Sequence, residues 1–259
     1  MPCERVVDIH SLDSDALTKL YDEANSLISG IRIEILPANR ADSARDRHPA
    51  ATVGLPPETP TIQFSVSLDR ISRIEAIAHE LAHLLLMYRY GLGIIGRKVP
   101  RGRCNEDVFH YFMSMPGDWV FLLGQIANTA HHLILIDHLR NEYGIESHLH
   151  YRVLQHDTRS IANDNNKDKE SVYAKGVIAF EYERLIGQFE RIIQPSSQTE
   201  SFWTAYHAAQ ECFGRYSYQS IPTSFTYEAN ILSFLEILGY ARENFIFFPE
   251  KVCDSRDSE

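Results

Sequence analysis

Apolar side chains in the first quarter of the chain recur with two different periods. Residues 13–29 carry leucine, isoleucine and alanine at helical spacing, and Gly30 follows them as glycine commonly follows the end of a helix. Residues 31–36 and 61–66 instead alternate apolar and polar side chains, which is the period of a half-buried strand. Residues 37–60 are rich in proline, arginine, aspartate and alanine and show no period, which indicates a long surface loop.

Two longer apolar helices are predicted next. The first runs from Asp69, a residue type that caps helix N-termini, to Gly91. After a loop over residues 91–102, the second is predicted over residues 118–143 and is closed by Gly144. The second helix is apolar almost all round, which is typical of a helix buried in a protein core.

The pattern after Tyr151 remains helical. A polar segment at residues 163–169 interrupts it, and we expect the aromatic stretch 216–227 to be a packed connection. The predicted helices in this part are residues 171–193, 200–213 and 225–245. The whole pattern predicts an α+β fold that is mainly helical, with a small N-terminal sheet packed on the helix of residues 69–91.

The composition is that of a globular chain and argues against several classes of function. The 259 residues are 44% apolar and 23% charged, and the four cysteines form no Cys-x-x-Cys pair. The formal net charge is -10 without a dense block of lysine and arginine, so we expect no nucleic-acid partner. No apolar run approaches the roughly 20 residues of a membrane-spanning helix, and the start of the chain lacks the layout of a signal peptide. We therefore expect no membrane association and a cytoplasmic location.

One short motif carries most of the chemistry in the sequence. Residues 79–83 read His-Glu-x-x-His, and side chains four residues apart share one face of a helix, so His79 and His83 can reach one metal ion. Glu80 lies beside that face, where it can act as a general base on a metal-activated water without being a ligand itself. Buried histidine and glutamate side chains are costly unless something compensates them, and Zn²⁺ would do so. The alternative is a hydrogen-bonded histidine pair in the core beside a solvated carboxylate.

The motif resembles the signature of the zincin superfamily of metallopeptidases. The resemblance covers residues 61–91, the motif and the strand before it, and it implies a zinc-binding catalytic helix next to the edge of a sheet. The metzincin branch is excluded, because Leu86 and Arg89 stand where its longer pattern has glycine and a third histidine. The glycine-rich and cysteine-bearing segments that accompany the motif in peptide deformylases are absent as well.

A catalytic zinc usually has three protein ligands, and the motif supplies only two of them. In the gluzincin branch it is a glutamate on a following helix, and Asn105-Glu106 resembles the start of that motif, although the residues after it do not continue the pattern. Asn128 and His132 lie four residues apart on the second apolar helix, a layout that also resembles uncharacterised bacterial proteins with the same motif. We predict His132 as the third ligand, with Glu106 and the neighbouring His131 as alternatives, and Asn128 could orient a ligand or hold substrate.

These patterns together predict a zinc-dependent metallopeptidase that acts on a peptide or protein substrate. Residues 1–150 would form the zincin-like catalytic region, with Glu80 as general base and with Zn²⁺ held by His79, His83 and His132. Residues 151–259 would form a helical region that walls one side of the cleft. Two alternatives remain open, namely a protein in which zinc only holds helices together and a regulatory or interaction protein descended from a peptidase.

Overall fold

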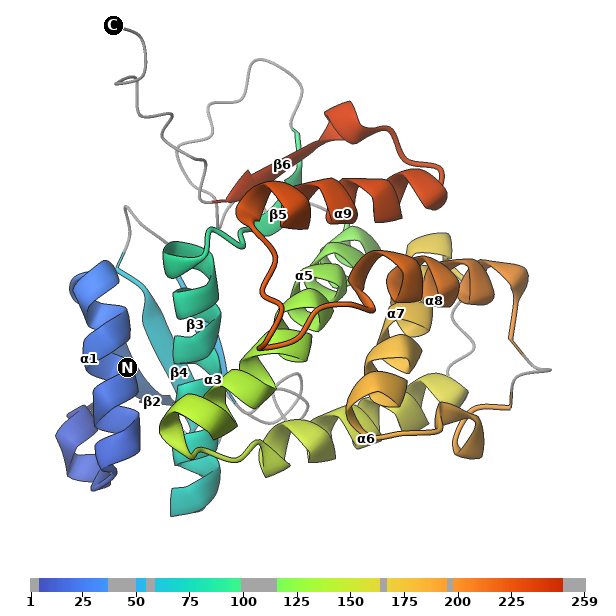
Figure 1. Ribbon diagram of the computed structural model, residues 1–259. Helices are drawn as coiled ribbons and strands as arrows, with labels where there is room; N and C mark the ends of the chain where they lie inside the picture. The colour runs from blue at the N-terminus through green and yellow to red at the C-terminus, as the bar shows by residue number, and fades with distance from the viewer. Residues whose placement is uncertain are drawn as a thin grey trace, which may run out of the picture.

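The computed structural model describes residues 5–36, 50–54, 59–98, 116–163, 167–194 and 198–248. These residues form a mainly helical α+β fold with two small sheets (Figure 1). The described α-helices are α1 (Asp15–Leu27), α3 (Arg70–Arg89), α5 (Gly117–His138), α6 (His148–Asn163), α7 (Lys169–Leu185), α8 (Glu200–Phe213) and α9 (Ser224–Ile237). The described strands are β1 (Arg5–Val6), β2 (Arg32–Leu36), β3 (Ala50–Val53), β4 (Thr61–Ser65), β5 (Ile94–Arg97) and β6 (Phe245–Phe248).

The larger sheet has the strand order β1-β2-β4-β3. The central pair β2 and β4 is parallel, with Ile33 opposite Ile62, and the two outer strands run antiparallel to their neighbours. The two strands expected from alternation, at residues 31–36 and 61–66, are thus confirmed as β2 and β4. The surface loop expected over residues 37–60 is wrong in part, because β3 lies within it and forms one edge of this sheet.

Helices α1 and α3 pack against each other beside this sheet, and α3 contacts both β3 and β4 (Figure 1). The hydroxyl of Ser14 caps α1 by accepting a hydrogen bond from the backbone of Leu17. The carboxylate of Asp69 caps α3 in the same way, by accepting from the backbone of Ser72. Gly91, at φ +68°, follows the end of α3 as expected. The cap and the terminal glycine therefore set the length of the motif-bearing helix.

Helix α5 packs against α3, α7 and β5 and continues as a π-helical turn, Leu139–Tyr143, that ends at Gly144 with φ +65°. Residues Gly117–Tyr143 form the one stretch, in the described part of the chain, that is long and apolar enough to cross a membrane. This corrects the expectation that no apolar run has that length. Because 67% of its most apolar window is buried inside the protein, the stretch has the packing of a core helix.

The structure departs from the predicted helices of the C-terminal half at two places and from a predicted loop at a third. Residues 171–193 form α7 and then a separate 3₁₀ turn, Phe189–Arg191, instead of one helix. The helix expected over residues 225–245 ends at Ile237, and the chain then forms β6. Its partner is β5, which lies within the loop expected over residues 91–102. Two short strands from distant parts of the chain thus form the second sheet, and neither is long enough to show its period clearly.

A single cluster of buried apolar residues joins the N-terminal and C-terminal halves. The boundary predicted at residue 150 falls inside α6, and side chains from both sides of it belong to this cluster. Helices α7 and α8 pack closely at Gly176, where an added Cβ would lie 2.4 Å from the carbonyl oxygen of Phe202. This close approach holds α7 in the position from which it contributes to the site described next.

Candidate metal centre

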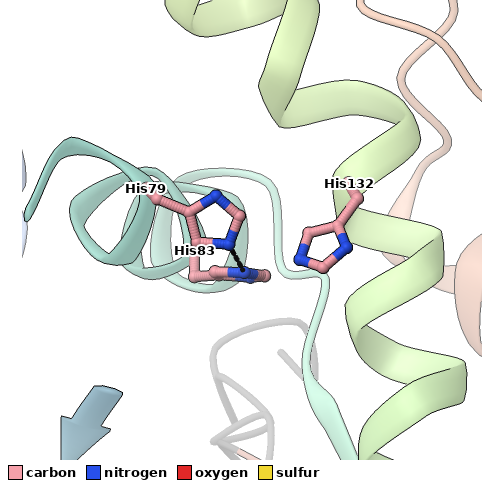
Figure 2. A group of neighbouring side chains, drawn as sticks. All are labelled: His79, His83 and His132. Atoms are coloured by element: carbon pink, nitrogen blue, oxygen red, sulfur yellow. Dashed lines mark hydrogen bonds between the residues drawn. The ribbon is translucent and has the colours of Figure 1, made fainter. Parts of the chain in front are cut away.

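The two motif histidines lie on one face of α3. Their Nε2 atoms are 3.1 Å apart (Figure 2). Two nitrogen ligands on a tetrahedral zinc, at the usual Zn–N distance, are separated by about 3.3–3.4 Å. The separation in the protein is close to this value, so His79 and His83 are arranged as a pair of ligands.

His132 approaches the pair from α5. Its ring centroid lies 4.9 Å from that of His79 and 5.2 Å from that of His83. One ring nitrogen from each of the three residues lies within 4.8 Å of the others, and Figure 2 shows a nitrogen of His132 facing the other two rings. The structure therefore brings together the three side chains that the sequence predicted as zinc ligands.

The other nitrogen of His132 is held by a buried carboxylate. His132 Nδ1 lies 2.6 Å from Oε1 of Glu181 on α7, so the nitrogen that faces the histidine pair is Nε2. The second carboxylate oxygen accepts from Thr129 Oγ1 at 2.5 Å and from Gln125 Nε2 at 3.0 Å. Burial alone would raise the pKa of Glu181, but the electrostatic attraction and hydrogen bond of His132, together with the nearby ring of His150, outweigh burial and hold that pKa well below its ordinary value. A histidine that donates to a carboxylate in this way is a common arrangement at zinc sites.

His131, the adjacent residue on α5, does not join the three-histidine group. Its Nδ1 lies 2.9 Å from Nδ1 of His83, on the side of that ring away from His79. Its Nε2 lies 2.9 Å from the carbonyl oxygen of Leu92 and 3.2 Å from the hydroxyl of Tyr227. Burial lowers the pKa of His131 to about 3, so the ring is neutral. The geometry thus argues against His131 as the third ligand, and Glu106 lies outside the described residues.

Glu80 faces the edge strand of the larger sheet. Oε2 of its carboxylate accepts a hydrogen bond of 2.8 Å from the hydroxyl of Thr52 on β3. Burial raises the pKa of Glu80, and the hydrogen bonds from Thr52 partly oppose that rise. Strand β3, which the sequence pattern did not reveal, therefore positions the predicted general base.

These groups lie in a cavity of about 440 Å³, within the roughly 300–1,000 Å³ of small-molecule sites. The elements that contribute to it are β3, α3, β5, α5, α6 and α7, so both halves of the chain form its wall. Its polar lining includes Asn128, and none of the described residues that line it is lysine or arginine. The residues that line the cavity include the histidines His79, His83, His132 and His150 and the carboxylates Glu75, Glu80, Asp157 and Glu181.

A second group of possible ligands is formed by His132, His150 and Glu181. His150 Nε2 lies 3.2 Å from Oε1 of Glu181, but the ring is not aligned for a hydrogen bond. This group competes with the first for His132, whose Nδ1 is already hydrogen-bonded to Glu181. In the three-histidine group the facing nitrogen of His132 is free of that hydrogen bond, so this group is the better candidate for a metal site.

His150 and Glu181 were not predicted from the sequence. Glu181 does give a signal, because it directly follows the apolar run Val177-Ile178-Ala179-Phe180, and a carboxylate buried beside such a run requires compensating partners. His150 gives none, since it lies at the start of an amphipathic helix in which polar residues such as His148 and Arg152 recur beside apolar ones. The expectation that a charged side chain next to an apolar run needs a partner could thus have identified Glu181 from the sequence.

In comparisons with known proteins, no family model, no curated protein and no solved structure matched the chain. The site is therefore interpreted from its own geometry and chemistry.

Proposed function

We propose that the protein is a zinc-dependent peptidase, with His79, His83 and His132 as metal ligands and Glu80 as general base. The observation that carries the proposal is the convergence of three imidazole nitrogens within 4.8 Å of one another in a cavity that Glu80 also lines. Three neutral nitrogen ligands are a usual donor set for catalytic zinc, which keeps one position open for water or substrate. Zn²⁺ bound there would act as a Lewis acid and lower the pKa of a water molecule to about 7.

The proposed role of Glu80 is to take a proton from the attacking water and deliver it to the leaving amine. The hydroxyl of Thr52 holds one oxygen of this carboxylate and so limits its rotation. Glu181 keeps a proton on Nδ1 of His132, which leaves the lone pair of Nε2 for the metal. Each residue of the set thus has a defined task in a single reaction.

The zincin resemblance supports hydrolysis of a peptide bond in particular. It implies a catalytic helix beside the edge of a sheet, and α3 contacts β3, the edge strand of the larger sheet. Apolar side chains such as Leu84, Ile94 and Ile178 line the same cavity. This lining suits an apolar substrate side chain better than an anionic one.

Metal content and turnover test the proposal together. We expect the purified chain to hold about one zinc ion and to cleave unstructured peptides. Glu80→Gln should keep the zinc and lose at least 100-fold in turnover, in line with the contribution of a general base. His132→Ala should lose both, whereas His156→Ala, which removes an exposed histidine on α6, should lose neither.

Two results would overturn parts of the proposal. Full turnover in Glu80→Gln would refute the role of Glu80 as general base. Zinc bound in four-coordinate form by protein side chains alone, with no peptide cleaved, would instead favour a metal that only holds helices together.

A further inference from the structure

His131 is a fully buried histidine, 1% exposed, that lies beside a metal ligand without facing the metal site. Its two ring nitrogens have different partners. Nδ1 lies 2.9 Å from Nδ1 of His83, and Nε2 lies 2.9 Å from the carbonyl oxygen of Leu92. The three groups form a chain of hydrogen bonds that ends at His83.

The positions of the protons in this chain follow from the partner at its far end. A carbonyl oxygen only accepts hydrogen bonds, so Nε2 of His131 must carry a proton. A neutral imidazole has one proton, and Nδ1 of His131 is therefore an acceptor. The hydrogen bond between the two Nδ1 atoms then requires the proton to be on His83.

The consequence for His83 concerns metal binding. With its proton on Nδ1, the neutral ring of His83 has a lone pair on Nε2, the atom that lies 3.1 Å from Nε2 of His79. The opposite tautomer would place a proton on Nε2 and exclude a metal ion from it. The tautomer of a ligating histidine is generally set by the hydrogen bond of its other nitrogen, most often to a carbonyl or a carboxylate.

We propose that His131 is a positioning residue that transmits the hydrogen bond of the Leu92 carbonyl to His83 and so sets His83 in its metal-binding tautomer. The matching task at His132 is performed by the carboxylate of Glu181. The hydroxyl of Tyr227, which is fully buried on α9, lies 3.2 Å from Nε2 of His131 and serves as a second acceptor for its proton. A carbonyl next to β5 and a side chain of α9 thereby help to define the metal site.

The significance of this inference rests on the proposed function, but its test does not require catalysis. The protonated nitrogen of His83 can be identified by ¹H–¹⁵N NMR of the metal-free, full-length chain with labelled histidine. We expect Nδ1 of His83 to carry the proton. In His131→Phe, which keeps a ring but removes both nitrogens, the proton should move largely to Nε2. In His131→Asn, the side-chain oxygen can accept near the former Nδ1 position and should restore the Nδ1–H tautomer.

A matched control is present on the same helix. His138 is 4% exposed, and neither of its ring nitrogens has a hydrogen-bond partner. His138→Phe therefore replaces a buried imidazole without removing a hydrogen bond, and it should leave the tautomer of His83 unchanged. Zinc affinity, measured by competition with a chelator, should fall about 10–100-fold in His131→Phe and stay near the original value in His131→Asn and His138→Phe.

The inference is overturned if His83 carries its proton on Nε2 in the original chain, or if His131→Phe leaves the tautomer unchanged. The measurement in the original chain decides the question even if His131→Phe does not fold. A chain that shows the expected tautomer but cleaves no peptide would refute the proposed function and leave this inference standing.

Discussion

Nδ1 of His132 lies 2.6 Å from Oε1 of Glu181, and both residues are buried. They come from α5 and α7, which are 49 residues apart in the chain at this point. The contact fixes the orientation of His132, so that its Nε2 faces the two histidines of α3 (Figure 2). A residue from the C-terminal half thus determines how the proposed metal ligand His132 is oriented.

Replacement of Glu181 should weaken metal binding without removing a ligand. In Glu181→Gln the negative charge beside His132 is lost, and we expect zinc affinity to fall about 10–100-fold, as measured by competition with a chelator. Glu190→Gln, an exposed glutamate nine residues on, is the control and should leave the affinity unchanged. An unaltered affinity in Glu181→Gln would mean that His132 is not a ligand or does not depend on this contact.

Thr52→Val should impair turnover while leaving the metal in place. The change keeps the branched shape of the side chain on β3 but removes the hydroxyl that donates to Glu80. We expect kcat/KM to fall about tenfold, equivalent to about 1.4 kcal/mol, which is near the value of one hydrogen bond to a charged group. Thr61→Val, on the neighbouring strand, removes a hydroxyl that contacts the backbone of Thr59 and should have little effect. Loss of zinc in Thr52→Val would contradict the assignment.

Stability should depend on pH through Glu23. Burial raises the pKa of this carboxyl, but hydrogen bonds from Tyr143 and Arg89 outweigh it, and the folded-state pKa lies below the ordinary 4.5. A lowered folded-state pKa contributes stability that is present above pH 4.5 and lost as the pH falls through the folded-state value. The contact joins α1 to α3 and to the π-helical turn after α5.

Urea unfolding between pH 3 and pH 7 measures this contribution. Glu23→Gln should lower the free energy of unfolding at pH 7 by about 1–2 kcal/mol and should reduce its decline with acid. Asp22→Asn, at the adjacent and exposed position, should retain the original decline. Parallel pH curves for the original chain and Glu23→Gln would show that the stabilisation has another source.

Two glycine-to-alanine changes should shift stability in opposite directions. At Gly176 an added Cβ would lie 2.4 Å from a backbone oxygen of α8, and we expect a loss of about 1–3 kcal/mol in the free energy of unfolding. At Gly124, on the exposed side of α5, an added Cβ meets nothing within 4 Å, and alanine should stabilise the helix by up to about 1 kcal/mol. Thermal unfolding of both variants checks the pair, and a stable Gly176→Ala would contradict the close packing of α7 on α8.

Local patterns predicted the elements that are long and have an evident period. The bounds expected for α3 and α8 agree with the structure, because each has a capping residue and repeated apolar positions. The strands β3, β5 and β6 were missed, since runs of four residues hold too few positions to show an alternation, and their pairing is set by distant partners. Gly144 marked the end of the long helical segment as predicted, although the last turn of that segment is π-helical.

The sequence by itself determined that His79 and His83 share one helix face with Glu80 beside it, because helical spacing is a property of neighbouring residues. It also narrowed the third ligand to a few candidates. Only the tertiary structure distinguished His131 from His132, the two candidates for the third ligand that lie among the described residues. The ring of His131 is oriented by Leu92 and Tyr227, which lie 39 and 96 residues away in the chain, and the ring of His132 by Glu181, which lies 49 residues away. Non-local hydrogen bonds of this kind leave no periodic trace in a single sequence, and they determine which nitrogen of each ring faces the proposed metal site.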